Sequence, residues 1–263
     1  MKSIRSILFP VVLTVGAGLH ATSSTGAPDT GSGAGPKLKT VVLVHGAFAD
    51  GSSWNAVIPL LQAKGLKVIA VQNPLTSLAD DVEFTNRAIN EAQGPVVLVG
   101  HSWAGAVITE AGDNDKVKSL VYVAAFAPSE GQSVSDTAKA YPTPPGLANP
   151  LVDSAGFLKL SSESVMKYFA PDLPAAQANL IAITQGAVRG KNFDEKLAKT
   201  AWLTKPSWYI VAEKDQMIDP AEEREAARKI KATTVSLPTS HVPMLSKPKE
   251  VADVIIAAAN NIK

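Results

Sequence analysis

Short, uniformly apolar segments alternate along this sequence with longer segments in which apolar residues recur at helical spacing, and few folds accommodate that order. The segment 40–44, Thr-Val-Val-Leu-Val, is continuous and rich in β-branched residues, as expected for a strand buried on both faces. Strands that alternate with helices predict a parallel sheet with helices on both faces. The expected strands span residues 40–44, 67–71, 95–99, 119–125, 207–212 and 233–237, and the expected helices span 54–63, 78–92, 104–111, 221–230 and 248–260. We therefore expect an α/β fold with a mostly parallel central sheet.

The composition agrees with a globular domain and excludes several functions. The chain has 263 residues, of which 46% are apolar, so a sizeable core is available. Its 25 Lys and Arg residues nearly balance 24 Asp and Glu residues, which leaves no basic footprint for nucleic acid. The absence of cysteine excludes disulfides, thiol catalysis and thiolate metal sites.

The N-terminal segment has the pattern of a secretory signal peptide. Lys2 and Arg5 precede an apolar run over residues 7–19 that is too short to span a bilayer comfortably, and small residues follow it. We predict a signal peptide over residues 1–21, a flexible leader over 22–37 and a folded domain over 38–263. This predicts a periplasmic or secreted protein without a stable membrane anchor after cleavage; an uncleaved anchor is the alternative.

One stretch interrupts the alternation of strands and helices. Residues 128–205 contain no strong buried strand, but they hold a Pro-rich piece and amphipathic fragments over 162–169 and 175–184. A structureless loop of that length is improbable in a compact domain. We expect a small helical cap inserted over the carboxyl edge of the sheet.

A serine lies in a tight turn between a buried strand and a helix. Ser102 follows the apolar run 96–99, and the residues two before and two after it, Gly100 and Ala104, are small enough to approach one another. Gly105 gives the strand and the helix further room. This context favours a nucleophilic serine. Gly is usual where Ala104 stands, a mild departure from the pattern.

Acyl transfer needs two hydrogen-bond donors directed at the developing oxyanion. One is expected from the backbone N–H of Trp103, at the positive end of the helix that follows the serine. The other is expected from the loop after the first strand, from Phe48 or Ala47. We interpret His45 in this loop as a structural residue that shapes the loop by hydrogen bonding.

The base follows by elimination among the four histidines. His20 lies in the leader, His45 in the oxyanion loop, and the side chain of His101 is expected to point away from the neighbouring serine. His241 remains, in the loop after the last strand.

Three acidic residues follow the strand over 207–212 and could orient the base: Glu213, Asp215 and Asp219. Asp215 is the best placed, whereas Asp219 precedes Pro220 and is typical of a helix N-cap. A buried Asp215 would select the tautomer of His241 and stabilise its protonated form.

These segments together resemble the α/β-hydrolase superfamily over nearly all of residues 38–263. The motifs at 43–47 (Leu-Val-His-Gly-Ala), 99–102 (Val-Gly-His-Ser) and 241–248 (His-Val-Pro-Met-Leu-Ser-Lys-Pro) are similar to the small methylesterase and hydroxynitrile-lyase branch. That resemblance implies an enzyme without cofactor or metal that acts on small molecules, here a small carboxylic ester, through an acyl-enzyme on Ser102. The oligomeric state stays open. The pocket lining expected from sequence position comprises Ala47, Phe48, Trp103, Phe126 and Met244; for Phe126 and Met244 a core role is equally expected.

The same triad supports other reactions. Lactone or amide hydrolysis, carbon–carbon or cyanohydrin cleavage, and a non-catalytic ligand-binding role are the alternatives. Lyases of the branch resemble one another in a lysine directly after the catalytic histidine and a threonine in the oxyanion loop. Here Val242 follows His241 and Gly46 follows His45, and both departures favour hydrolysis.

Overall fold

The computed structural model describes residues 38–262. The expected signal peptide and leader lie outside the described residues. Within residues 38–262, no helix combines the length and the apolar character that a membrane crossing requires.

Six parallel strands form the central sheet in the order β2-β1-β3-β4-β8-β9. Their bounds are β1 Thr40–Val44, β2 Lys67–Val71, β3 Val96–Ser102, β4 Val117–Ala125, β8 Ser207–Ala212 and β9 Thr233–Leu237. The central strands β1, β3 and β8 are buried at every position, which explains why they read as continuous apolar runs. The prediction of a mostly parallel sheet is confirmed.

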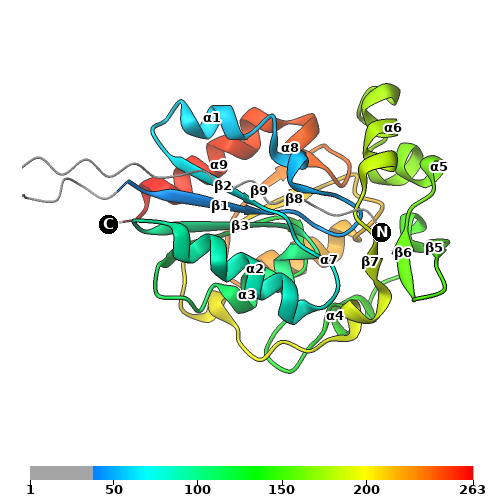
Figure 1. The fold of residues 1–263 in the computed structure, drawn as a ribbon, viewed down its shortest axis with the longest axis horizontal. Coiled ribbons are helices and arrows are strands. Elements are labelled where there is room, and N and C mark those ends of the chain that lie inside the picture. Colours follow the sequence, from blue (N-terminus) through cyan, green and yellow to red (C-terminus); the bar gives the residue numbers. More distant parts are fainter. Residues whose placement is uncertain (1–37, 263) are drawn as a thin grey trace, which may run out of the picture. The chain divides into compact units, whose positions relative to one another are not determined.

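Helices cover both faces of this sheet (Figure 1). The helices α1 and α9 lie on one face and α2 and α3 on the other, while α7 packs against β8. Their bounds, with the short helix that precedes α9, are α1 Ile58–Gln62, α2 Leu78–Glu91, α3 Ala104–Ala111, α7 Pro220–Lys229, α8 Pro243–Ser246 and α9 Pro248–Asn260. The single helix predicted over 54–63 is divided: a 3₁₀ turn, η1 Gly51–Trp54, is capped by Asp50, and α1 starts at Ile58.

Most of the insertion over residues 128–205 lies at one end of the sheet, and its last residues return along helix α3 (Figure 1). It contains the helices α4 Val134–Ala138, α5 Ser162–Ser164 and α6 Ala175–Thr184, the π-helical turn η3 Val165–Phe169, and the 3₁₀ turns η2 Pro145–Leu147, η4 Gly190–Asp194 and η5 Ala201–Leu203. It also contains an antiparallel sheet of β5 Leu151–Val152, β6 Phe157–Lys159 and β7 Val188–Arg189. We expected a small helical cap, and the structure adds these three short strands to its helices. The strands escaped prediction because they are only two or three residues long and largely exposed.

The parallel sheet places the loops that carry chemistry at one edge. Ser102 is the last residue of β3, and the loops after β1, β8 and β9 hold Phe48, Asp215 and His241 respectively. Because the strands run the same way, their carboxyl ends meet, and ligands of open α/β sheets bind there. The cap lies over this edge (Figure 1).

Candidate active site

Ser102 ends strand β3 in a strained conformation. Its φ angle is 53°, in the left-handed region, and the strain of a non-glycine residue there costs about 1–3 kcal/mol. The turn depends on small neighbours: a Cβ atom on Gly100 would lie 2.6 Å from the carbonyl oxygen of Ala104. On Gly105 it would lie 2.0 Å from the carbonyl oxygen of Phe126. The close approach predicted for Gly100 and Ala104 is therefore present.

His241 and Asp215 meet across 26 residues of sequence. The Nδ1 atom of His241 lies 2.5 Å from Oδ2 of Asp215, and both side chains are buried. With Nδ1–H donating to the carboxylate, Nε2 of a neutral ring is left as the basic nitrogen. Ser102 and His241 line the same cavity. The structure thus brings together all three residues expected for the triad.

The other oxygen of Asp215 is held by its own loop. Its Oδ1 accepts hydrogen bonds from the backbone N–H groups of Met217, at 2.6 Å, and Ile218, at 3.1 Å. Asp219 instead caps helix α7 and accepts from the N–H of Ala221 at 2.8 Å. This geometry separates the two acids as the sequence predicts, with Asp215 beside the histidine and Asp219 at a helix terminus.

His241 is enclosed by aromatic rings and by the cap. We expected His101 to point away from the serine; its ring nevertheless contacts the base, with centroids 4.7 Å apart, and its Nε2 donates to the carbonyl oxygen of His241 at 2.7 Å. Burial, reinforced by the neighbouring His241, lowers the pKa of His101 well below its ordinary value. Phe169 of the cap packs edge-on against His241, with centroids 5.2 Å apart.

The cap also holds the backbone next to the base. The carboxylate of Asp172, between η3 and α6, accepts from the N–H of Ser240 at 2.9 Å and from its hydroxyl group. Ser240 immediately precedes His241. The cap therefore holds the loop that carries His241 as well as covering it.

The loop after β1 presents Phe48 to the serine. Phe48 adopts a φ of 58°, and Ala47 and Phe48 line the same cavity as Ser102. His45 holds this loop as expected: its Nδ1–H donates to the carbonyl oxygen of Gly46, and its Nε2 accepts from the N–H of Asn73, both at 2.9 Å. Burial lowers the pKa of His45, which keeps the ring neutral.

Gly46 leaves no room for a side chain beside the nucleophile. A Cβ atom there would lie 2.8 Å from the Cβ of Ser102 and 2.9 Å from the carbonyl oxygen of His101. Real Cβ atoms essentially never approach another atom so closely. The glycine is therefore a steric requirement of the loop after β1.

The cavity above Ser102 has a volume of about 230 Å³ and a largely apolar wall. Ala47, Phe48 and Phe126 lie on this wall, and the full set is Ala47, Phe48, Ser102, Phe126, Val134, Ser135, Ala138, Leu147, Pro150, Leu158, Phe193, Met217 and His241. Trp103 and Met244 were expected on it and are absent. The Trp103 indole turns away to donate its Nε1–H to Asp81 at 2.7 Å, and Met244 is fully buried at the start of α8.

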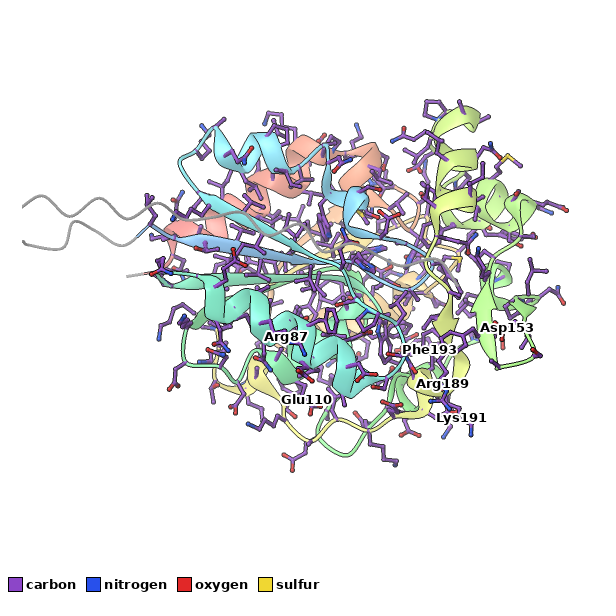
Figure 2. All side chains as sticks on the ribbon, viewed as in Figure 1. Arg87, Glu110, Asp153, Arg189, Lys191 and Phe193 are labelled. Atoms are coloured by element: carbon purple, nitrogen blue, oxygen red, sulfur yellow. The ribbon has the colours of Figure 1, made fainter. Side chains whose placement is uncertain are left out.

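Most of the remaining wall comes from the cap. Phe193 lies between the core and the outer part of the cap, whereas Asp153 marks the outer edge (Figure 2). Sequence reasoning missed the cap residues because nothing local shows which of them face the serine. Met217 could have been found, since it lies two residues after the expected acid.

Two buried acids near the site were also missed. Asp81 of α2 accepts from the Trp103 indole and from the N–H of Leu75, and burial raises its pKa to about 6. Glu223 of α7 accepts from the N–H of Ala212 at 2.8 Å, and burial raises its pKa well above its ordinary value. Both occur in charged helical segments that resemble solvated faces. Among the described residues, no group of three or more His, Asp or Glu side chains is arranged to hold a metal ion.

The chain is similar to known hydrolases in sequence and in structure. The chain is 28% identical over 243 residues to the pyrethroid hydrolase of Sphingobium wenxiniae, which covers 82% of this chain and 85% of that protein. It is 27% identical over 255 residues to methylesterase 2 of Arabidopsis thaliana, covering 84% of this chain and 95% of that protein. A crystal structure of a pyrethroid hydrolase superposes with a TM-score of 0.76 at 25% identity, covering 85% of this chain and 98% of that one.

These relatives are named hydrolases and esterases, and the chain is accordingly an enzyme of the hydrolase class. The model of the alpha/beta hydrolase family matches residues 41–254, from the first strand of the sheet into the last helix. The chain therefore belongs to the alpha/beta hydrolase family.

Proposed function

We propose that this protein hydrolyses small, uncharged carboxylic esters through an acyl-enzyme on Ser102. The observation that carries the proposal is the buried 2.5 Å contact between His241 and Asp215 at a cavity that also holds the strained Ser102. A base oriented by a carboxylate, beside a serine in a tight turn, is the arrangement that activates a hydroxyl group for attack.

In the proposed reaction, Nε2 of His241 takes the proton of Ser102 as the serine oxygen attacks the ester carbonyl. Asp215 stabilises the protonated imidazole. The alcohol leaves with the proton from His241, and water cleaves the acyl-enzyme by the same route in reverse. Hydrolysis of one ester bond thus consumes one water molecule and returns His241 to its neutral form.

The backbone N–H groups of Phe48 and Trp103 are proposed to bind the oxyanion. Trp103 is the N-cap of α3, so its N–H lies at the positive end of the helix. Among backbone hydrogen bonds outside the regular elements of residues 38–262, none uses the N–H of Phe48 or Trp103. Both donors are therefore available to a ligand.

The cavity wall supports an apolar, uncharged substrate. Apart from His241, its residues carry no ionisable side chain, so a charged substrate would lose hydration without gaining a partner. The names of the relatives, a pyrethroid hydrolase and a methylesterase, support an ester of a small molecule.

Cyanohydrin cleavage is disfavoured by the same wall. The departing cyanide is an anion that needs a positive charge near the base, and Val242, directly after His241, is apolar and buried. Lys214 and Lys247 do not line the cavity. We expect no release of cyanide from mandelonitrile or acetone cyanohydrin above the uncatalysed rate.

The test is a panel of p-nitrophenyl esters of increasing acyl length, assayed with the wild type, Ser102→Ala and Ser154→Ala. Ser154 is exposed in the β5–β6 turn and serves as the matched control. Ser102→Ala should lower kcat by roughly 10⁴-fold and abolish fluorophosphonate labelling. Ser154→Ala should keep the wild-type kcat and the wild-type labelling. Ester turnover by Ser102→Ala near the wild-type rate would refute the assignment.

A further inference from the structure

Glu223 is a fully buried acid, and one oxygen of its carboxyl group has no hydrogen-bond donor among the described residues. It lies in the first turn of α7, and its side chain has no solvent exposure. Oε2 accepts a hydrogen bond from the N–H of Ala212, the last residue of β8, at 2.8 Å. Oε1 is buried and receives no donor from any described residue. A buried ionised oxygen without a donor is costly, so its protonation state needs an explanation.

The neighbour that explains this oxygen is the acid of the triad. Glu223 and Asp215 are both held by Ala212, whose N–H donates to Glu223 at 2.8 Å and whose carbonyl oxygen accepts from the N–H of Asp215 at 3.1 Å, and the two carboxyl groups interact directly. Two carboxylates in contact, both removed from water, cannot both be ionised at moderate cost, so one of them keeps a proton.

The hydrogen-bond donors around the pair decide which acid keeps the proton. Asp215 receives three donors: His241 Nδ1–H and the N–H groups of Met217 and Ile218. Glu223 receives one, from Ala212. Donors favour the ionised form, so Asp215 is the anion and Glu223 the neutral acid. Burial, followed by the charge of Asp215, raises the pKa of Glu223 well above its ordinary value.

The other charged groups around Glu223 do not change this assignment. Glu213, in the loop after β8, is engaged by Arg224 at 2.5 Å and adds negative charge to the surroundings of Glu223. Tyr209 of β8 donates its hydroxyl proton to the carbonyl oxygen of Ala125.

We propose that Glu223 is a neutral carboxylic acid whose Oε1–H donates to Asp215 and thereby positions the triad's acid and moderates its basicity. Glu223 is a positioning residue, since Asp215 and His241 lie between it and the cavity. An O–H···O⁻ bond of this kind is short and strong. It links helix α7 to the catalytic base through a single carboxylate.

The first experiment compares the kcat/KM–pH profiles of Glu223→Gln and Glu223→Met with that of the wild type. Glutamine can accept from Ala212 and donate to Asp215, so it should leave kcat/KM and the midpoint of the acid limb unchanged. Methionine cannot donate. It should lower kcat/KM roughly tenfold and raise the midpoint by about half a pH unit, because a more basic Asp215 stabilises protonated His241.

The adjacent Glu222→Gln is the matched control. Glu222 is also buried in α7 but lies against the cap residue Thr137, and its replacement should leave the acid limb in place. If Glu223 were ionised, Glu223→Gln would remove a negative charge and lower the midpoint. A lowered midpoint in Glu223→Gln, or a Glu223→Met profile identical to the wild type, would overturn the proposal.

A second experiment needs no enzymatic turnover, so it stands even if the proposed esterase function, on which the kinetic test rests, is wrong. It measures the Tm of the wild type and Glu223→Gln between pH 4.5 and 8. In the unfolded chain Glu223 ionises near its ordinary pKa of 4.5, whereas in the folded protein it stays protonated. The wild type should therefore lose stability relative to Glu223→Gln as the pH rises. A Tm difference that does not change with pH would contradict a neutral Glu223.

Discussion

Replacing Gly46 with alanine tests whether the oxyanion loop and the nucleophile are packed as tightly as the structure indicates. The new Cβ would lie 2.8 Å from the Cβ of Ser102. This is about 0.7 Å less than the closest comfortable carbon–carbon contact. The other close atoms belong to His101, at 2.9 Å for its carbonyl oxygen and 3.0 Å for its Nδ1. All three neighbouring atoms belong to strand β3, so the loop that carries Phe48 must move away from this strand.

A displacement of the Phe48 loop by that distance has a predictable effect on catalysis. A displacement near 1 Å in a reacting group or oxyanion donor costs roughly 10²-fold in rate, so we expect kcat to fall by that factor. Overpacking costs about 1–3 kcal/mol of folding free energy. The alanine also lowers the conformational entropy of the unfolded chain, which stabilises the folded state by about 0.4–1 kcal/mol. The net loss of stability should lie between about 0 and 2.6 kcal/mol, small enough for the variant to remain folded.

The assay is p-nitrophenyl butyrate hydrolysis combined with urea denaturation. Gly190→Ala is the matched control, because a Cβ there meets its nearest neighbour at an ordinary 3.4 Å. We expect the control to keep its kcat and stability. A kcat for Gly46→Ala within threefold of the wild type would show that the loop is not packed against the nucleophile as argued.

Three further predictions follow from the site and its surroundings. Asp215→Asn should lower kcat by roughly 10³–10⁴-fold, because it favours the wrong tautomer of the histidine. Asp219→Asn should lower the folding stability by only about 1 kcal/mol. Ester kinetics and urea titration separate the two effects, and the reverse ranking would move the acid role to Asp219. Burial raises the pKa of Glu222 from 4.5 to about 7, so its contribution to stability is present below pH 4.5 and lost as the pH rises to 7. Glu222→Gln should remove about 3 kcal/mol of that pH dependence, measured by urea titration at both ends, and an unchanged slope would contradict it. Phe193→Ala should raise kcat/KM for long acyl esters relative to short ones, because Phe193 lines the cavity. Leu203→Ala, at an exposed position, is the control and should leave this ratio unchanged. The same long-to-short ratio of kcat/KM in both variants would place Phe193 in the core rather than on the pocket wall.

The sheet and the serine turn were predictable because their signals are local. A strand buried on both faces is apolar along most of its length, and β1, β3 and β8, buried at every position, each contain a continuous apolar run. The turn at Ser102 needs small residues at fixed offsets, and Gly100 and Ala104 stand there. His241 followed from elimination in a chain with four histidines. These inferences used neighbouring residues or the order of elements along the chain.

The direction of individual side chains and the charge state of buried acids depend on residues distant in sequence. Trp103 adjoins the nucleophile, yet its indole turns to Asp81, 22 residues earlier, so it does not line the cavity. The fold brings the Phe193 side chain, 91 residues after Ser102 in the chain, to the cavity that contains Ser102. Glu223, in a highly charged helix, resembles a solvated residue until α7 packs on β8 and buries it against Asp215. Local periodicity therefore determines which elements form and where the catalytic loops end. The pocket wall and the protonation of the acid pair arise only when distant elements pack together and exclude water.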